Sequence, residues 1–356
     1  MQAGYPANVK ALLLSEYNRL EVVDLPMPRP VADEVLLRVE ACGICGSDVH
    51  GYDGSSGRRI PPIVMGHEAA GTVIAVGPGV TNVHEGDRVA PDSTVYCGKC
   101  AYCRRGEINL CDHREVLGVS TQDFRRAGAF AEFVTVPHHI LHPLPESLPF
   151  PEAAMIEPLA VAVHAVSLAG ETKGARALVV GAGMIGLLTL QALRVAECES
   201  VYVVDIEDSR LELATNLGAT AVINAKTADA AATLQRLTNG CGVDIAMEAV
   251  GSTPTIRTAI ENVRKGGTVV LIGNIAPTAE IPLQIVVSRQ LRLQGSAASS
   301  GEYPRCIELL STGQVNVSRL ISAVAPLEEG AQWFERLHSR PQGLMKVVLT
   351  PTGDAV

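Results

Sequence analysis

The 356-residue chain lacks a hydrophobic run long enough to cross a membrane. A spanning helix needs about 20 consecutive apolar residues, and no stretch of this sequence approaches that length. The N-terminal segment has only the short apolar run ALLL, with no small-residue cleavage site after it, which is unlike a secretory signal. We therefore expect a cytoplasmic protein with no membrane partner.

The sequence also lacks a cluster of basic residues. It carries 29 Lys and Arg against 38 Asp and Glu, a net charge of −9, which argues against a nucleic-acid partner. Charged residues make up only 19% of the chain and hydrophobic residues 47%, the composition of a folded protein rather than a disordered one. The length exceeds what one core usually organises, so we expect two domains.

The first 150 residues contain short runs typical of β-strands, separated by Gly and Pro. Examples are EVLLRVEA, AAGTVIAVG, DRVAPDSTVY and FAEFVTV. Helical patterns are scarce in this stretch. The sequence therefore predicts an all-β, barrel-like first domain.

The pattern changes near residue 152. EAAMIEPLAVAVHAVSLAG has helical spacing without an internal Gly, and we predict one helix there. Apolar runs and helical segments then alternate from ALVVGAG to LRLQGSA, which indicates a parallel sheet covered on both faces. The last stretch is too short to fold alone, so the α/β chain is expected to form one domain from 1–154 and 296–356 and another from 155–295.

A glycine-rich turn joins the run RALVV to the helical segment that begins MIGLL. Gly181 permits a tight turn, Gly183 lets the backbone approach a pyrophosphate, and Gly186 lets the helix pack closely on the strand. Met184 and Ile185 begin the helix, whose free N–H groups favour phosphate. Such turns also occur for packing reasons alone, so the motif needs support.

Asp205 gives that support, since it ends the next apolar run, nineteen residues after Gly186. A carboxylate there accepts bonds from ribose hydroxyls and repels a 2′-phosphate, which favours NAD over NADP. Arg210 could hold such a phosphate, but beside Asp205 we interpret it as stacking near the adenine. The alternative is that Asp205 only caps a helix. Further contacts to the cofactor are expected after later strands, at Val250, Ile272, Gly273, Asn274, Ser296 and Ala297.

Four of the nine cysteines lie within fifteen residues, in the lobe 93–114. In a reducing compartment such a cluster indicates a metal site rather than disulfides. Four thiolates close a tetrahedral zinc site with no open position, so its role would be structural. An iron–sulfur cluster is the alternative. The ligands would be Cys97, Cys100, Cys103 and Cys111.

The remaining cysteines and several histidines are isolated from any partner in the sequence. We interpret Cys42, Cys198, Cys241 and Cys306 as small buried apolar residues. The group His138, His139 and His142 has no partnering Cys or carboxylate that would make a metal site, and we interpret the helical His164 as packed rather than ligating.

The order of motifs resembles that of zinc-containing medium-chain dehydrogenases over essentially the whole chain. These motifs are CGSDVH from Cys45 to His50, Gly66-His67-Glu68, the four-cysteine lobe, Glu157-Pro158 and the glycine-rich turn. The likeness is greatest to the polyol, sorbitol-like branch, with threonine dehydrogenases and sugar-alcohol-phosphate dehydrogenases as neighbours. It implies a GroES-like β-barrel catalytic domain, a Rossmann domain with a doubly wound parallel sheet, two zinc ions per subunit, and a homodimer or homotetramer.

The resemblance also implies a catalytic zinc held by Cys45, His67 and carboxylate oxygen. Such a set leaves a position for substrate. Glu68 and Glu157 are implied as exchanging ligands or as outer partners. From the residues alone, Glu68 could be a surface carboxylate and Glu157 a charge that complements a helix dipole.

Three further residues are implied to support that zinc. Ser47 would bond the substrate oxygen and begin a proton relay, His50 would end the relay near solvent, and Asp48 would orient His67. Alternatively, Ser47 and Asp48 are turn formers and His50 is merely exposed. Arg58 and Arg59, which follow in GSSGRR, could line the substrate pocket or be solvated loop charges.

The implied reaction is transfer of a hydride from a secondary alcohol to NAD⁺. The substrate would be a polyol, a sugar alcohol or a sugar acid. Sorbitol-type enzymes have an Arg-Tyr pair after the last Rossmann strand, where this chain has Ala298 and Ser299, so sorbitol itself is in doubt. The alternatives are a threonine dehydrogenase-like oxidation of a hydroxy amino acid, a zinc-free reductase of the same fold, and a non-catalytic NAD-binding zinc protein.

Overall fold

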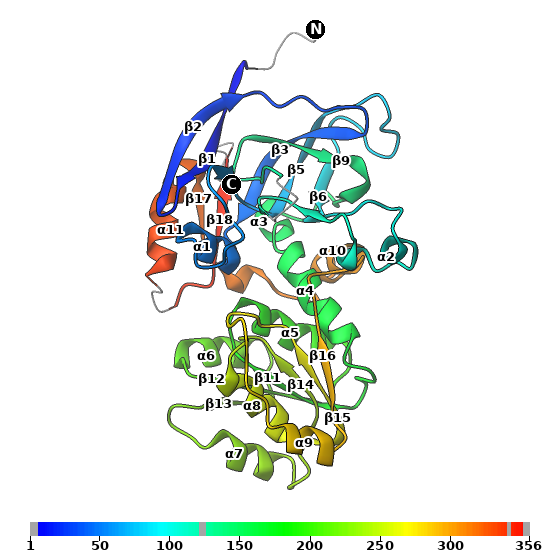
Figure 1. Ribbon diagram of the computed structural model, residues 1–356, viewed down its shortest axis with the longest axis vertical. Helices are drawn as coiled ribbons and strands as arrows, with labels where there is room; N and C mark the ends of the chain where they lie inside the picture. The colour runs from blue at the N-terminus through cyan, green and yellow to red at the C-terminus, as the bar shows by residue number, and fades with distance from the viewer. Residues whose placement is uncertain (1–5, 121–125, 340–342, 352–356) are drawn as a thin grey trace. The chain divides into compact units, whose positions relative to one another are not determined.

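Two large clusters of buried apolar side chains organise the structure, a computed structural model that describes residues 6–120, 126–339 and 343–351. Each cluster belongs to one of two compact units (Figure 1). Unit 1 comprises Met1–Glu157, Tyr303–Ser311 and Val317–Val356, and unit 2 comprises Pro158–Glu302 and Thr312–Asn316. The sequence places these boundaries at 154/155 and 295/296. The outer ends of its first domain, 1–5 and 352–356, lie outside the described residues.

Unit 1 is built from β-strands around the larger apolar cluster. A three-stranded sheet has the order β2-β1-β4, and a seven-stranded sheet has the order β10-β6-β5-β3-β18-β17, with β9 paired to β3. The strands are β1 (Asn8–Glu16), β2 (Arg19–Pro26), β3 (Glu34–Gly43), β4 (Ile63–Val64), β5 (Glu68–Val76), β6 (Arg88–Pro91), β9 (Phe133–Pro137), β10 (Leu141–Pro143), β17 (Ile321–Pro326) and β18 (Lys346–Thr350).

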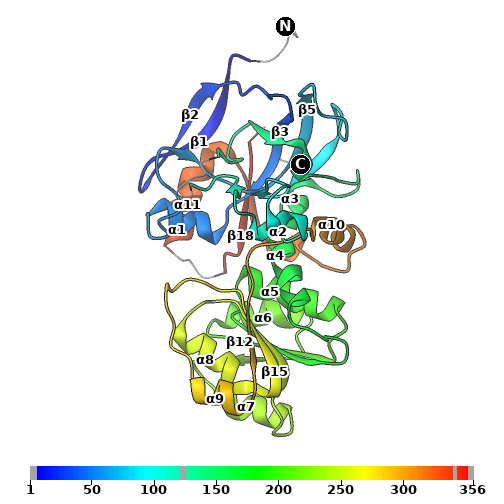
Figure 2. The same cartoon turned by 45° about the vertical axis from the view of Figure 1, so that its right-hand side comes forward.

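The end of the chain returns to unit 1. Strand β18 pairs antiparallel with β3 and parallel with β17. Figure 2 follows this return, with the red β18 among the blue and cyan strands of unit 1 and α11 (Gly330–His338) beside α1 (Gly46–Tyr52). Strands β17 and β18 therefore extend the sheet that carries the chemistry-bearing segments.

The segment DRVAPDSTVY, predicted as one strand, forms two. β6 joins the large sheet, whereas β7 (Thr94–Val95) pairs with β8 (Glu115–Val116) in a separate ribbon. The chain turns between them, where the carboxylate of Asp92 accepts a bond from the backbone N–H of Thr94 at 2.9 Å. This turn leaves Asp92 and Ser93 outside both ladders.

The single helix predicted for EAAMIEPLAVAVHAVSLAG was wrong. The structure has two, α3 (Phe150–Ala153) and α4 (Ile156–Ser167), with a turn at Ala154 and Met155. Pro158 explains the break, because proline has no N–H to donate and its ring clashes with the carbonyl four residues earlier, that of Ala154. The break places Glu157 in the first turn of α4.

Unit 2 contains a six-stranded sheet in which every pairing is parallel. Its order, β13-β12-β11-β14-β15-β16, reverses direction at β11 and is the doubly wound arrangement predicted for this region. The strands are β11 (Arg176–Val180), β12 (Ser200–Asp205), β13 (Ala221–Asn224), β14 (Val243–Glu248), β15 (Val263–Leu271) and β16 (Arg292–Gly295).

Four helices of unit 2 pack along this sheet, and α9 (Leu283–Ser288) lies against one of them, α8 (Figure 1). The four are α5 (Met184–Val195), α6 (Asp208–Asn216), α7 (Ala230–Leu237) and α8 (Thr253–Asn262). Most of α4, from Pro158 onward, also belongs to unit 2. Because all six strands are parallel, their carboxyl ends meet at one edge of the sheet. Within the described chain, no helix has both the length and the apolar character that a bilayer crossing demands.

Candidate functional site

The structure brings three of the predicted metal donors together in unit 1. The thiol of Cys45, a ring nitrogen of His67 and a carboxylate oxygen of Glu68 all lie within 4.8 Å of one another. A thiolate, an imidazole and a carboxylate are donors that zinc accepts, and three of them leave a fourth position for another ligand. The residues present therefore fit a zinc ion.

Local structure explains why these donors converge. Strands β3 and β5 pair antiparallel, with Gly43 opposite Glu68, so the end of one strand meets the start of the other. Cys45 then caps α1, where its sulfur accepts a bond from the N–H of Ser47 at 3.4 Å. The site thus lies where a strand, a helix N-terminus and a second strand meet.

Asp48 lies behind His67, on the side of its Nδ1. Its carboxylate is fully buried, and Oδ1 is 3.4 Å from Nδ1 of His67, which leaves Nε2 as the nitrogen for a metal. Burial opposes ionisation of Asp48, but His67 and Arg59 outweigh it and hold the pKa of this carboxyl well below its usual range. Burial likewise lowers the pKa of His67, and Asp48 and Cys45 outweigh it and raise that pKa well above the ordinary value.

Glu68 is not a surface carboxylate, because only 1% of it is exposed. Lys346, equally buried, donates to both of its oxygens, at 2.7 and 2.5 Å, and to the carbonyl of Ile44 at 3.0 Å. Burial lowers the pKa of Lys346, but the charge of Glu68 outweighs it and raises that pKa. One of the three donors, Glu68, is therefore itself part of a buried ion pair.

Glu157 lies near the same site but outside the three-donor cluster. Its Oε1 accepts a hydrogen bond from the hydroxyl of Ser93 at 3.0 Å. The hydroxyl oxygen of Tyr303, a fully buried residue, accepts a bond from the backbone N–H of Ser93 at 3.2 Å. Burial raises the pKa of Glu157, and the charge of Glu68 adds to that rise.

Ser47 and His50 are both on α1, but they differ in their surroundings. The Ser47 hydroxyl lies 3.3 Å from the Cys45 sulfur and accepts a bond from Arg59 at 3.0 Å. His50 is partly exposed, and among the described residues no hydrogen bond links its ring to Ser47. Its place at the end of a relay stays a prediction.

The four predicted thiol ligands of the lobe also converge. The sulfurs of Cys97, Cys100, Cys103 and Cys111 all lie within 4.8 Å of one another. Backbone N–H groups point at them, including the N–H of Cys100 at 3.4 Å from the Cys97 sulfur. N–H bonds from Cys103 and Asp112 lower the pKa of Cys100 to about 6, whereas burial and the neighbouring sulfurs raise that of Cys103 to about 12. Four thiolates at this separation need a cation, which fits zinc.

The predicted dinucleotide-binding residues gather at the carboxyl edge of the unit 2 sheet. Gly181 follows β11 with φ +98°, and Gly183 caps α5, which Met184 and Ile185 begin. A Cβ on Gly186 would overlap the carbonyl of Gly181, so only glycine permits this close approach. The other expected contacts follow later strands, namely Val250 after β14, Ile272, Gly273 and Asn274 after β15, and Ser296 and Ala297 after β16.

Asp205 ends β12 beside this turn and is bound to it. Its Oδ2 accepts the N–H of Ala182 at 2.6 Å, and its Oδ1 accepts the N–H groups of Ile206 and Glu207 at 2.7 and 2.9 Å. The carboxylate is therefore fixed at the point where a ribose is expected. Arg210 lies on α6 and is exposed.

The cysteines outside the two clusters are not all buried. Cys42 and Cys306 are, but the expectation was wrong for Cys241, which is exposed, and for Cys198, which is partly so. Cys241 lies between two glycines of positive φ in the turn after α7, where no core exists to cover it.

The other histidines have partners that are not metal donors in a cluster. His138 bonds the side chain of Asn82, His139 bonds a backbone carbonyl, and His142 stacks on Tyr303. His164 is buried, and its Nδ1 lies 2.7 Å from the carboxylate of Glu302.

Comparison with known proteins agrees with this geometry. Residues 31–146 match the model of the alcohol dehydrogenase GroES-like domain, and residues 185–312 match that of the zinc-binding dehydrogenases. Sorbitol dehydrogenase from Bacillus subtilis (strain 168) is 34% identical over 351 residues, which cover 97% of this chain and 98% of the relative. The chain belongs to the zinc-containing medium-chain dehydrogenases, in their polyol dehydrogenase-like branch.

Solved structures of medium-chain dehydrogenases superpose on nearly the whole chain. An Escherichia coli oxidoreductase/dehydrogenase of unknown specificity matches with TM-score 0.91 and 34% identity, covering 96% of this chain and 99% of the other. A putative zinc-binding dehydrogenase from Sinorhizobium meliloti 1021, bound to NADP, matches with TM-score 0.88 and 32% identity, covering 97% and 100%. The predicted family, fold class and enzyme class are confirmed. This dehydrogenase is an oxidoreductase of small-molecule alcohols that uses zinc and a nicotinamide cofactor.

Two residues of the dehydrogenase site were missed from the sequence, and the role of a third was left open. Lys346 is the lone charge at the start of a buried strand, and Ser93 follows Asp92 at the break of a predicted strand. Arg59 was left open as either a pocket residue or a solvated charge. A single charge in an apolar run is a signal that could have identified Lys346. Sequence alone could not name its partner.

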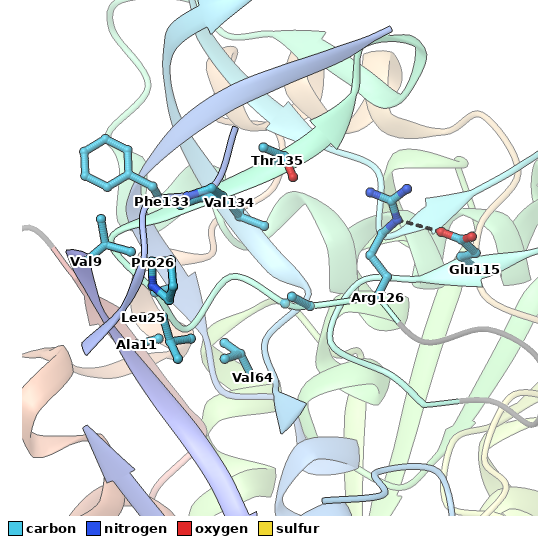
Figure 3. Close-up of a pocket in the computed structure, with 14 residues that line it drawn as sticks. Val9, Ala11, Leu25, Pro26, Val64, Glu115, Arg126, Phe133, Val134 and Thr135 are labelled. Carbon is cyan, nitrogen blue, oxygen red and sulfur yellow. Dashed lines mark hydrogen bonds and ion pairs between the residues drawn. The ribbon is translucent and has the colours of Figure 1, made fainter. Parts of the chain in front are cut away.

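A cavity of about 370 Å³ also lies in unit 1, apart from the dehydrogenase site (Figure 3). Most of its lining residues are apolar, Val9, Leu25 and Phe133 among them, but polar and apolar atoms share its surface about equally, and the ion pair of Arg126 with Glu115 is at one side. None of the predicted metal, catalytic or cofactor residues lines it.

Proposed function

We propose that this dehydrogenase oxidises a secondary alcohol of a polyol, sugar alcohol or sugar acid, with NAD⁺ as hydride acceptor and two zinc ions per subunit. The carrying observation is the convergence of Cys45, His67 and Glu68 within 4.8 Å, next to the Ser47 hydroxyl. A zinc ion at this cluster would act as a Lewis acid that lowers the pKa of an alcohol hydroxyl, and the nicotinamide would take the hydride.

The chain's own residues then have separate tasks. Cys45 and His67 hold the ion, and Asp48 fixes the ring of His67 from behind. Ser47 takes the proton of the substrate hydroxyl at its Oγ and passes its own proton outward, with His50 as the receiving group near solvent.

Glu68 and Glu157 share the remaining ligand role unequally. Both oxygens of Glu68 accept bonds from Lys346, so a bond from Glu68 to the ion would compete with that pair. Glu157 is held by the hydroxyl of Ser93, a weaker restraint on a carboxylate. We therefore propose that Glu157 exchanges with substrate or water at the ion, and that Glu68 binds the ion only when its bond to Lys346 is released.

The preference for NAD⁺ rests on Asp205. Its carboxylate is held by three backbone N–H groups, so it stays where it would accept ribose hydroxyls and repel a 2′-phosphate. The relative from S. meliloti is bound to NADP. Arg210, exposed on α6, is the residue that would serve a phosphate if this assignment fails.

The four-cysteine lobe is assigned as the second zinc site, with a structural role. A cytoplasmic location and a dimeric or tetrameric assembly stay predictions. Ala298 and Ser299 in place of an Arg-Tyr pair argue against sorbitol and leave the substrate within the wider polyol and sugar-acid class.

The experiment is a panel of polyols, sugar alcohols and sugar acids with NAD⁺ and NADP⁺, followed by the absorbance of the reduced nicotinamide. We expect turnover with NAD⁺, loss of turnover after chelation, and less than 1% of activity in Cys45→Ser. Turnover with NADP⁺ alone would contradict the role of Asp205. Full activity in Cys45→Ser would contradict the metal site.

A further inference from the structure

Arg59 is a buried arginine beside the candidate zinc site. Only 3% of it is exposed, whereas its neighbour Arg58 is exposed. An arginine is almost never buried without a partner that compensates its charge. A solvated loop charge would need no further explanation, but the burial of Arg59 does.

The hydrogen bonds of this guanidinium point to the site. Its Nη2 donates to Oδ1 of Asp48 at 2.8 Å and to Oγ of Ser47 at 3.0 Å. Its Nε is buried and has no partner in the part of the chain that the structure describes. One nitrogen thus reaches both the carboxylate behind His67 and the hydroxyl beside Cys45.

The fold makes room for Arg59 and fixes its backbone. Gly51 of α1 lies against it, and a Cβ at that glycine would overlap the Arg59 side chain. On either side of Arg59, Ser120 bonds the carbonyl of Arg58 through its N–H at 2.9 Å and that of Ile60 through its hydroxyl at 3.5 Å. The Arg59 side chain therefore enters the site from a loop whose backbone is held by hydrogen bonds at both neighbouring residues.

We propose that Arg59 is a positioning residue for alcohol oxidation, an inference that rests on the proposed function. It compensates the buried negative charge of Asp48 and holds this carboxylate in place. Asp48 can then orient the ring of His67 without moving toward it. Arg59 also fixes the hydroxyl of Ser47. Arginine has only donors, and a hydroxyl oxygen has two lone pairs. Ser47 therefore accepts from Arg59 with one lone pair and keeps the other for the substrate hydroxyl, while its own hydrogen points to the Cys45 sulfur or outward along the relay.

Two consequences follow for the reaction. Because arginine keeps its protons, the relay from Ser47 cannot run through Arg59 and has to leave by another route. Because outer partners of a metal-binding histidine usually change metal affinity by about 10–100-fold, loss of Arg59 should weaken metal binding as well as turnover.

The test compares Arg59→Met, Arg59→Lys and the matched control Arg58→Met. Cobalt(II) is titrated into protein that retains only its four-cysteine zinc, and the cobalt–thiolate absorption of the Cys45 site reports binding without any turnover. We expect Arg59→Met to weaken cobalt affinity at least tenfold and to lower kcat more than it raises KM. Arg59→Lys should recover part of both, and Arg58→Met should stay within twofold of wild type.

A double-mutant cycle distinguishes the proposed role of Arg59 from a general loss of folding. Arg59→Met with Asp48→Asn leaves no unpaired buried charge, so it should fold even if Arg59→Met alone does not. Its loss in cobalt affinity should not exceed the larger single loss, because both changes act through the same pair. Additive losses, or an Arg59→Met variant that behaves like Arg58→Met, would overturn the inference. If wild type binds no cobalt at Cys45 or oxidises no alcohol, the proposed function fails instead.

Discussion

Single residues in this site act mainly as paired buried charges. Glu68 and Lys346 are 1% and 2% exposed, and Asp48 and Arg59 are 0% and 3% exposed. In a medium of low polarisability, each charge is tolerated only because its partner is present. One pair contains the donor Glu68, and the other lies behind the donor His67. Both pairs therefore contribute to the electrostatic field at the candidate zinc site.

Lys346→Met should destabilise the zinc-loaded protein by about 3 kcal/mol, because Glu68 would remain buried without its partner. Adding Glu68→Gln should recover a large part of that loss, since the double variant leaves no uncompensated charge. The free energy of unfolding from urea titration measures both. Equal losses in the single and double variants would show that Lys346 contributes packing rather than charge compensation.

The donors and the adjacent Asp48 could be predicted from sequence, but the buried lysine that pairs with Glu68 could not. Cys45 and Asp48 lie in one short motif, and His67 directly precedes Glu68, so local spacing suffices to group them. Lys346 lies 278 residues from Glu68 and meets it only because β18 pairs with β3. Such a contact depends on the complete sheet, which no local pattern encodes.

At the scale of elements, the junction of β11 and α5 carries the most specific expectation. Gly183 has an extended backbone with φ −72°, and a Cβ there would meet nothing in the protein. A Cβ on Gly186 would overlap a backbone carbonyl. Gly183 therefore leaves room for a ligand, whereas Gly186 allows the helix to lie close to the preceding turn.

Gly183→Ala should leave the melting temperature within about 2 °C and weaken NAD⁺ binding at least tenfold, because its methyl group would occupy the pyrophosphate position. Gly186→Ala should instead lower the melting temperature by several degrees, because strand and helix must separate. Thermal unfolding and calorimetric NAD⁺ titration of both variants provide the comparison. A Gly183→Ala protein with wild-type affinity would contradict this placement of the dinucleotide.

A small network of hydrogen bonds and ion pairs joins the starts of three strands of the unit 2 sheet, β11, β14 and β15. Asp244 of β14 accepts the N–H of Arg176, the first residue of β11, at 2.8 Å, and the side chain of Arg264 of β15 at 2.5 Å. Burial alone would raise the pKa of Asp244, but Arg264 and Arg176 outweigh it and lower that pKa. The ionised form is therefore favoured in the folded state.

The sign of the pH effect follows from that lowered pKa. The contribution of Asp244 is present above about pH 4, its unfolded pKa, and is lost as pH falls through the lower folded value. Asp244→Asn should cost about 1–2 kcal/mol at pH 7, and the difference from wild type should shrink progressively below pH 4. Urea unfolding of both proteins at a series of pH values measures this. A difference that stays constant down to pH 2.5 would contradict the assignment.

Prediction at this scale succeeded where one periodicity governs a long segment. The alternation from β11 to β16 predicted a parallel sheet covered by helices, because short apolar runs alternate with helical segments, and the structure has that sheet. It failed at Pro158, where one proline divides a helical pattern, and at Asp92, where a side-chain turn divides a strand. A hydrophobic periodicity in the sequence does not reveal the single residue that interrupts the helix or the strand.

For the whole molecule, the two chemistries are assigned to different folding units. All candidate metal donors, including the four-cysteine lobe and Glu157, lie in unit 1, and the glycine-rich turn and Asp205 lie in unit 2. Each unit has its own buried core. Metal binding and dinucleotide binding should therefore be separable in experiment.

Chelation should abolish turnover while NAD⁺ binding changes by less than about threefold. A metal bound only to the folded state stabilises the unit that holds it, so zinc removal should lower the protection of β3 and β5 amides from hydrogen exchange. The amides of β11 to β15 should keep their protection, because their core contains no metal donor. Calorimetric NAD⁺ titration and hydrogen-exchange mass spectrometry, before and after chelation, measure the two effects on one sample. Cys45→Ser should bind NAD⁺ as wild type does, and loss of NAD⁺ binding in either case would mean that the metal organises unit 2 as well.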